Sequence, residues 1–288
     1  SLDVLLADPK VEALLVLTPP RTHTEIALAA ARAGKDVLLE KPVDVDHARA
    51  KALVEAIEGM GRVFGIVFQH RFREGAIALR EALRGGRLGD LLSVSASIRW
   101  WRSAEYFAEP GRGTIARDGG GVLLTQAIHT LDLMLDLAGP PQRVAALVRT
   151  SPLRKIDTED IACATLQYRN GAVGVIDATT VAYPGYPERV EIAGTNGSAV
   201  LAAERLELNL QGAPARVIDG GSAGGGGADP MAFSPDAHRR LIADFLDAVE
   251  ARRQPQASAR SALAIHALID AMLDSSRRGV AVEVATSA

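Results

Sequence analysis

The sequence lacks several features that define particular classes of protein. It has one cysteine, Cys163, so no disulfide can form within the chain, and we expect a reducing, cytoplasmic setting. No uninterrupted apolar segment reaches the ~18 residues that span a bilayer, and we expect no signal peptide. A formal net charge of −3 gives no basic surface for nucleic acid or an anionic membrane. We therefore expect a small-molecule substrate, with no nucleic-acid or membrane partner.

Metal-binding patterns are also missing. His129 and Asp132 are close in sequence, but no other histidine or cysteine has the spacing of a ligand set. We therefore predict no metal site.

Short apolar runs alternate with helix-like segments over residues 1–70. The runs at 13–17, 36–40 and 63–67 have the length and composition of buried parallel strands. Alternation of strand and helix at these intervals is typical of a right-handed βαβαβ layer. Three strands are few for this architecture, so we predict an α/β fold that opens with an incomplete, Rossmann-like parallel layer, the C-terminal part of a dinucleotide-binding domain.

The pattern changes over residues 71–288. Alternating apolar and polar residues between 143 and 210 predict strands, and turn pairs such as Asn170-Gly171 are typical of hairpins. We predict an α+β domain with a large, mainly antiparallel open sheet, and closing helices at about 236–278. A further helix is predicted over 122–137. The glycine-rich segment Gly220–Gly227 is expected to form a mobile loop rather than a phosphate cradle.

Glu40, Lys41 and Pro42 follow the second predicted strand. Ligands of open α/β sheets bind at the carboxyl ends of the strands, so this carboxylate and ammonium form a candidate site. The alternative is a solvated charge pair at the end of a strand.

A second candidate site lies on the helix that follows Gly119-Gly120-Gly121. Thr125, His129 and Asp132 share one face of the predicted helix, and Gln126 lies beside His129. A histidine held by an aspartate can act as a general acid or base near neutral pH. The alternative is a histidine that only bridges the two parts of the chain.

Aromatic residues make up only 4% of the sequence, yet four of them gather between residues 100 and 107. Trp100, Trp101, Tyr106 and Phe107 alternate with arginines that include Arg102. Rings and guanidinium groups together suit sugars, aromatic acids or carboxylates. The alternative is an ordinary packed loop.

These motifs, in this order, resemble the glucose–fructose oxidoreductase / inositol dehydrogenase / rhizopine catabolism (Gfo/Idh/MocA) family. The resemblance is carried by Thr18-Pro19-Pro20 with His23, by Gly34 through Glu40-Lys41-Pro42, by Arg71-Phe72, and by the triglycine with His129 and Asp132. It implies a Rossmann domain followed by an α/β domain whose open sheet builds a homodimer or homotetramer. It also implies a cofactor, NAD or NADP, and a sugar-like substrate.

The resemblance also implies roles for individual residues. Lys41, before a cis proline, and His129 would be catalytic. The cofactor would be bound by Thr18, Pro19, Pro20, His23, Glu40 and Lys41. The substrate would be bound by Arg71, Trp101, Arg102, Tyr106, Gln126 and His129.

Two departures from the family pattern affect the expected activity. The opening strand and glycine-rich turn are absent, about 60 residues in a standard Rossmann half, so we expect weakened cofactor binding. Many members carry Asp four residues before the histidine, where this chain has Thr125. Threonine cannot serve as a base near neutral pH, which shifts proton transfer to Lys41 or His129.

The expected function is NAD(P)-dependent oxidation or reduction of a sugar, sugar acid or polyol. One alternative is decarboxylation of an aromatic acid, as in relatives that resemble dihydroxyphthalate decarboxylase. Another is a catalytically inactive, ligand-sensing relative, although such a protein would need neither Lys41 nor His129.

Overall fold

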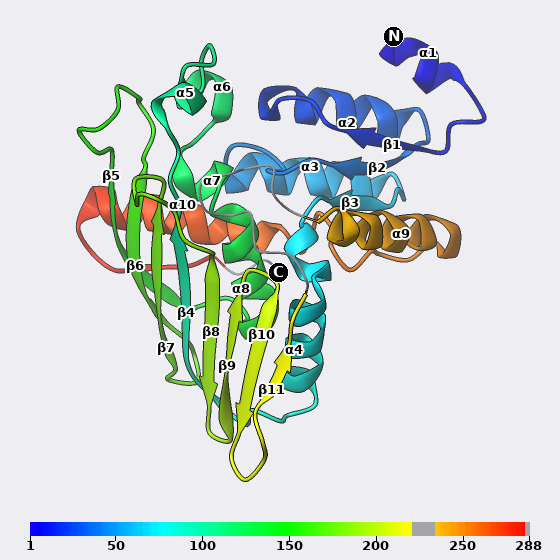
Figure 1. Ribbon diagram of the computed structural model, residues 1–288. Helices are drawn as coiled ribbons and strands as arrows, with labels where there is room; N and C mark the ends of the chain where they lie inside the picture. Colours follow the sequence, from blue (N-terminus) through cyan, green and yellow to red (C-terminus); the bar gives the residue numbers. More distant parts are fainter. Residues whose placement is uncertain (221–233, 286–288) are drawn as a thin grey trace.

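The structure contains two sheets that are joined by helices packed between them (Figure 1). It is a computed structural model that describes residues 1–220 and 234–285. Most of the glycine-rich segment Gly220–Gly227 lies outside the described residues. No helix in the part of the chain that is described is long and apolar enough to cross a membrane.

The first sheet is the predicted parallel layer, in the order β1-β2-β3. β2 is buried along its whole length because α2 and α3 pack on the layer, with alanines of α2 fully enclosed. The elements of this part are α1 (Leu2–Ala7), β1 (Ala13–Val16), η1 (Pro20–Thr22), α2 (His23–Arg32), β2 (Asp36–Leu39), α3 (His47–Gly59), β3 (Phe64–Ile66) and η2 (Gln69–Phe72).

The second sheet has nine strands in the order β11-β10-β9-β8-β4-β7-β6-β5-β12. Every pairing is antiparallel except β4 with β7, which confirms the predicted large, mainly antiparallel sheet. Its strands are β4 (Leu91–Arg99), β5 (Arg143–Arg149), β6 (Ile161–Gln167), β7 (Val173–Thr179), β8 (Arg189–Gly194), β9 (Gly197–Ala202), β10 (Arg205–Leu210), β11 (Arg216–Ile218) and β12 (Val282–Glu283).

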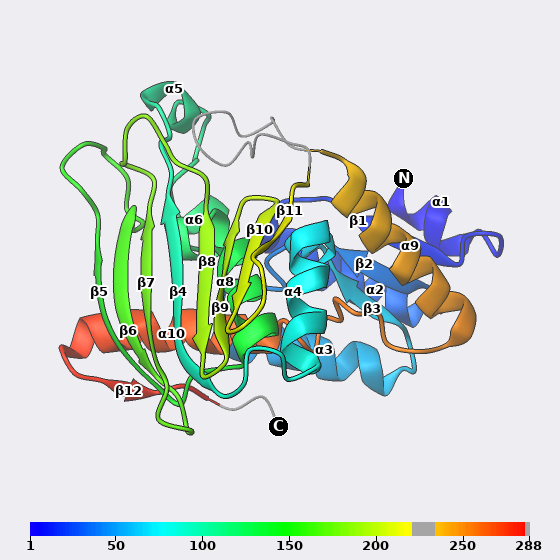
Figure 2. The same cartoon turned by 60° about the horizontal axis from the view of Figure 1, so that its bottom comes forward.

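Helices cover only one face of the large sheet (Figure 2). The covering helices are α4 (Glu74–Arg84), α8 (Ile128–Ala138) and α10 (Leu263–Arg278). Side chains alternate between buried and exposed along most of the central strands, so the other face carries residues exposed to solvent. Val173 and Val175 on that face are 58% and 49% exposed.

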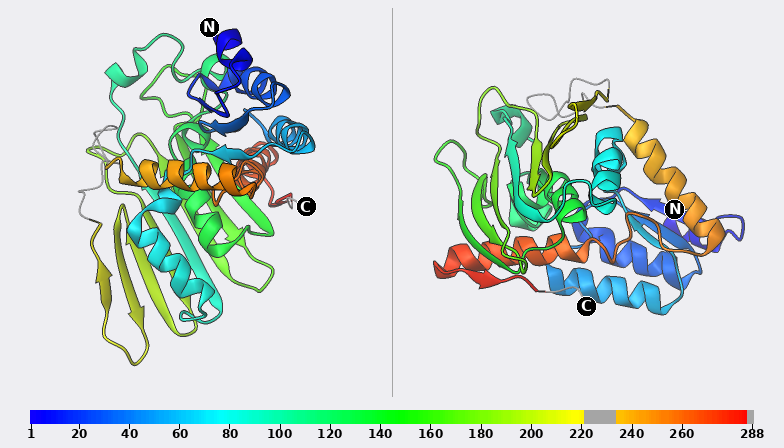
Figure 3. Two further views of the ribbon diagram at one scale, coloured as in Figure 1. Left: turned by 90° about the vertical axis from the view of Figure 1, so that its right-hand side faces the viewer. Right: turned by 90° about the horizontal axis from the view of Figure 1, so that it is seen from below.

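The closing helices return to the first part of the chain (Figure 3). α9 (Asp236–Ala251) packs on η2, and α10 packs on α3. A Cβ atom at Gly65 in β3 would lie 2.9 Å from the Phe245 ring of α9, so this glycine permits the close approach. Residues more than 170 positions apart in sequence thus lie at one edge of the small sheet.

The helix predicted over 122–137 is interrupted. The structure has α7 (Val122–Thr125) and then α8, with a break at Gln126-Ala127. The Thr125 hydroxyl donates to the Gly121 carbonyl at 2.6 Å, and the Thr125 carbonyl accepts from the Lys41 ammonium rather than from the next turn. Two short helices, α5 (Ala104–Phe107) and α6 (Ile115–Asp118), lie in the segment that precedes the triglycine.

Two buried histidines hold the segment that follows β2. The Lys41–Pro42 bond is cis, as the family resemblance implied. His23 lies 2.8 Å from the Pro42 carbonyl through Nδ1, and Nε2 of His266 accepts a hydrogen bond from the Val43 amide at 3.2 Å. The backbone next to Lys41 is therefore fixed from α2 on one side and from α10 on the other.

The His266 contact predicts a pH-dependent contribution to stability. Burial lowers the pKa of His266 to about 4, whereas a histidine in an unfolded chain titrates near ~6.5. Below that pH the unfolded state binds a proton that the folded state excludes, so stability is lost as the pH falls. We expect His266 to account for a loss of about 2.5 kcal/mol between pH 7 and 4.5.

The test is urea unfolding of wild type and His266→Gln at both pH values. The glutamine amide oxygen can still accept from Val43, but it does not titrate. The variant should therefore lose less stability on acidification. Equal losses in both proteins would contradict the assignment.

Candidate active site

Two cavities meet at Lys41. One, of about 280 Å³, extends toward His129 and α9, and the other, of about 240 Å³, extends toward Thr18 and Pro20. The residues that line both are Glu40, Lys41, Tyr106, Thr125 and Gln126. We call them the inner and the outer cavity, respectively. The predicted site at the end of β2 is thus brought against the predicted site near the triglycine.

The Lys41 side chain joins the two parts of the chain. Its Nζ donates to the Thr125 carbonyl at 2.7 Å, and its backbone amide donates to the Glu40 carboxylate at 3.0 Å. Burial lowers the pKa of Lys41, and the negative charges of Glu40 and Asp118 oppose that shift. An ammonium held by one carbonyl keeps further N–H groups for a ligand in either cavity.

The triglycine allows close approach of a backbone segment. A Cβ atom at Gly121 would lie 1.9 Å from the Glu159 carbonyl oxygen, so only glycine fits. The Glu159 carboxylate accepts from the amides of Gly121 and Leu123 at 2.9 and 3.1 Å, at the start of α7. This contact places Thr125, and hence Lys41, at the junction of the cavities.

His129 lines the inner cavity, but Asp132 does not hold it. Nδ1 of His129 is buried and has no hydrogen-bond partner among the described residues. Burial lowers the pKa of His129 well below its usual value, and the positive charges of Lys41 and Arg73 add to the shift. The imidazole is therefore uncharged at neutral pH and able to accept a proton. The predicted pairing with Asp132 is wrong, because Asp132 is bound to Arg71.

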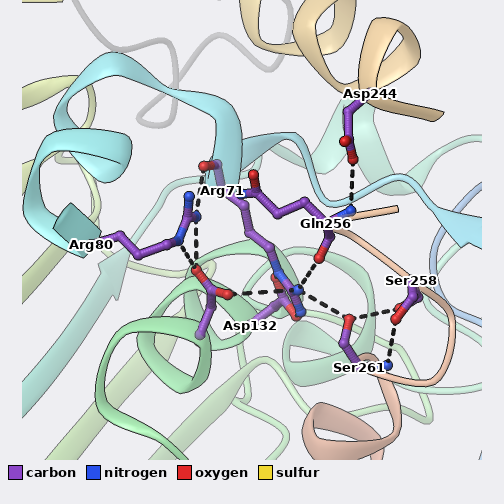
Figure 4. A network of polar contacts seen from close by, with 8 residues as sticks. Arg71, Arg80, Asp132, Asp244, Gln256, Ser258 and Ser261 are labelled. Atoms are coloured by element: carbon purple, nitrogen blue, oxygen red, sulfur yellow. Dashed lines mark hydrogen bonds and ion pairs between the residues drawn. The ribbon is translucent and has the colours of Figure 1, made fainter. Parts of the chain in front are cut away.

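Arg71 lies in a buried network away from both cavities (Figure 4). Its guanidinium donates to the two Asp132 oxygens at 2.7 and 2.6 Å, and to Ser261 Oγ at 3.0 Å. Arg80 extends the network by donating to the Arg71 carbonyl at 2.8 Å. Arg71 is 4% exposed, so its position argues against the predicted substrate contact and indicates a role in joining η2, α8 and the segment before α10.

The aromatic cluster also needs correction. Trp100 lines the inner cavity, whereas Trp101 contacts Tyr183 with ring centroids 5.5 Å apart and lines neither cavity. Successive side chains along an extended segment point to opposite sides. Trp100 and Trp101 therefore cannot both face the inner cavity, and Trp100 is the one that does. Arg102 lies 4.9 Å above the Trp100 ring, and Gln126 donates to the Tyr106 hydroxyl at 3.3 Å.

Four of the six predicted cofactor residues line the outer cavity: Thr18, Pro20, Glu40 and Lys41. Pro19 is exposed and lines neither cavity. His23 is fully buried and lies 2.8 Å from the carbonyl oxygens of both Thr18 and Pro42. It therefore holds the two loops together, and the structure gives it no surface for a cofactor.

Several residues of the inner cavity were not predicted from sequence. They are Gln69, His70, Arg73, Glu188, Glu204, Ser234 and His238. Gln69 and His70 directly precede the Arg71-Phe72 motif, so that motif was a usable signal for two of them. His238 comes from α9, and nothing in its local sequence indicates that the helix reaches the site.

Among residues 1–220 and 234–285, no group of three or more His, Cys, Asp or Glu side chains is arranged to hold a metal ion.

Comparison with known proteins identifies the family. Residues 1–68 match an oxidoreductase family with an NAD-binding Rossmann fold, and residues 76–200 match the GFO/IDH/MocA C-terminal domain. The chain belongs to the GFO/IDH/MocA oxidoreductase family. Its resemblance to this family, first drawn from short motifs, is thereby confirmed.

The relatives include named dehydrogenases. An inositol 2-dehydrogenase of Rhizobium meliloti is 26% identical, over 96% of this chain and 81% of the relative. A myo-inositol 2-dehydrogenase of Thermotoga maritima is 29% identical, over 67% of this chain but only 57% of the relative. A levoglucosan dehydrogenase structure, in complex with NADH and levoglucosan, superposes with a TM-score of 0.87 at 25% identity, over 98% of this chain and 83% of that one.

The Arg71 network predicts a large effect on stability. Replacing Arg71 by methionine leaves the Asp132 carboxylate buried without its main partner, which we expect to cost about 3–5 kcal/mol. The double variant Arg71→Met/Asp132→Leu removes that unpaired charge and should recover part of the loss. Urea unfolding of the three proteins measures both effects. Full stability of Arg71→Met, with only a raised KM, would instead indicate a substrate contact.

Proposed function

We propose that this chain forms the catalytic region of an NAD(P)-dependent dehydrogenase that acts on a sugar, sugar acid or polyol. The observation that carries the proposal is the position of Lys41 where the two cavities meet. A hydride-transfer enzyme needs a cofactor ring and a substrate carbon in contact, with a proton-handling group beside them. Lys41 lies at the point where two such ligands would touch.

The lining of the inner cavity supports a polyhydroxylated substrate. Nearly every side chain that lines this cavity can form hydrogen bonds, including the two aromatic ones, Trp100 and Tyr106. Donors and acceptors in one small cavity match hydroxyl groups, which both donate and accept.

The outer cavity fits the nicotinamide side of a dinucleotide. Thr18, Pro20 and Glu40 lie at the carboxyl ends of β1 and β2, where dinucleotides bind in this architecture. Within the described residues, the small sheet has no glycine-rich turn that leads into a helix. The cofactor contacts that we assign are therefore limited to residues near the nicotinamide ring. A nicotinamide bound there would supply the hydride acceptor or donor.

The two catalytic groups divide the proton chemistry. The Lys41 ammonium, fixed by the Thr125 carbonyl, donates a hydrogen bond to the reacting oxygen and stabilises developing negative charge. The uncharged His129 accepts the hydroxyl proton during oxidation. Thr125 contributes its carbonyl to Lys41, while its hydroxyl donates to the Gly121 carbonyl.

Lys41→Met should reduce kcat/KM for hydride transfer by about 10²–10⁴-fold, in protein produced from the complete gene. Lys35→Met is the matched control. Lys35 lies before the start of β2, is 7% exposed, and also donates from Nζ to a carbonyl, that of Asp8 at 2.8 Å. The rates are followed by the absorbance of reduced nicotinamide over a panel of sugars, sugar acids and polyols.

Equal loss of turnover in both lysine variants would show that the effect is structural. Release of CO₂ from an aromatic acid without hydride transfer would favour the decarboxylase instead. Binding of sugars without any turnover would favour a ligand sensor.

We further propose that the open face of the large sheet joins copies of this chain into a homodimer or homotetramer. This face holds a shallow hollow of about 720 Å³, lined by valines between small polar residues that include Ser95 and Thr165. Val173 and Val175 line it and are exposed. An apolar patch of this kind on an uncovered sheet face is typical of an interface.

Val175→Arg should convert the assembly to single protomers, because two copies of the face would bring buried like charges together. Val4→Arg is the control, since Val4 is 66% exposed on α1, away from the large sheet. Sedimentation analysis distinguishes the species. A monomeric wild type, or an unchanged assembly in Val175→Arg, would contradict the proposed interface.

A further inference from the structure

A row of buried polar side chains lies beside His129 in the wall of the inner cavity, and the proposed reaction uses none of them directly. Glu188 pairs with Arg73 at 2.6 Å, and Arg73 Nη2 lies 2.8 Å from Nε2 of His70. The His70 ring in turn lies 5.1 Å from the His129 ring, at 32°. Arg73, His70 and Glu188 are all at least nine-tenths buried.

The contact with Arg73 determines the tautomer and the charge of His70. A guanidinium group has only donors, so Nε2 of His70 must offer its lone pair. The proton of the neutral ring is then on Nδ1, and a second proton would face the fixed charge of Arg73. Burial lowers the pKa of His70 well below its usual value, and Arg73 is the largest charge that adds to the shift. His70 is therefore an uncharged ring in one tautomer.

His129 is packed against this fixed ring. Phe68 contacts it edge-on, with ring centroids 6.0 Å apart, while His70 covers another side. No carboxylate hydrogen-bonds to its Nδ1 among the described residues. The charged or titratable groups that act on it are Lys41, Arg73 and His238, and all of these oppose a positive charge on its ring.

Negative groups are present nearby but are already engaged. Glu188 is bonded to Arg73, and the Glu40 carboxylate accepts from the Lys41 amide. The surroundings of His129 therefore differ from those of a histidine that is paired with an aspartate, whose carboxylate would favour the charged ring.

We propose that Arg73 is a positioning residue, which keeps His129 uncharged by its nearby positive charge and keeps it in one orientation through the fixed ring of His70. The role rests on the proposed function, because it keeps His129 ready to accept the substrate proton in mildly acidic solution. A carboxylate partner raises the pKa of a histidine, whereas the Arg73–His70 pair favours the uncharged ring of His129. His129 can therefore accept a proton at lower pH, but it is a weaker base.

The test is a histidine titration by NMR in the protein without substrate. His129→Asn identifies the His129 signal among the six histidines of the sequence. In wild type, His129 should remain unprotonated at pH 6.5, where a free histidine is half protonated. Half-protonation of His129 at that pH in the wild type would overturn the proposal without any variant.

The double variant Arg73→Gln/Glu188→Gln removes the local cation and leaves no unpaired buried charge. We expect the His129 midpoint to rise by about one pH unit, a tenfold change in the ionisation constant. The acid limb of kcat/KM should move by the same amount. An unchanged His129 midpoint in a folded variant would overturn the proposal.

Arg80→Gln/Asp136→Asn is the matched control, because it removes another largely buried pair, 2.7 Å apart, that does not contact His70. It should leave the His129 midpoint unchanged, and an equal shift there would assign the effect to general loosening. The titration needs no turnover. Failure to observe hydride transfer would therefore count against the proposed function, while the NMR result decides the role of Arg73 separately.

Discussion

The site depends on one hydrogen bond, from the Lys41 ammonium to the Thr125 carbonyl at 2.7 Å. It connects the end of a strand in the small parallel sheet with a helix break that packs on the large sheet. An intact helix would have used that carbonyl for its own next turn, so the break at Gln126 is what makes it available. Glu159 sets the start of α7 and the histidines His23 and His266 set the backbone beside Lys41, so both partners arrive prepositioned.

Several buried histidines and arginines around this bond stabilise the fold rather than line a cavity. His23 and His266 satisfy backbone groups, while Arg71 neutralises Asp132 inside the protein. His129 is left without a carboxylate partner and next to cations. The proposed base, His129, is therefore uncharged, and Lys41 is bound to the Thr125 carbonyl. This arrangement suits the proton transfer coupled to hydride transfer that we propose.

Much of the architecture could be predicted from sequence, because burial periodicity is local information. The apolar runs predicted all three strands of the small sheet, and alternation predicted most strands of the large one. The partners of Arg71 and of Thr125 could not be predicted, since they depend on contacts across more than 60 residues. The sequence does not distinguish Trp100 from Trp101, because the direction in which each side chain points from an irregular segment depends on tertiary contacts. His238 was missed because the approach of α9 is a tertiary feature.

The most direct measurement of the central claim is transfer of deuterium from substrate to nicotinamide. Protein from the complete gene is incubated with the oxidised cofactor and carbon-deuterated monosaccharides, sugar acids and polyols, and the reduced cofactor is analysed by mass spectrometry. A site in which Lys41 joins a cofactor cavity to a polar substrate cavity predicts a deuterated cofactor, and predicts none with Lys41→Met. Binding of both ligands without deuterium transfer would contradict it.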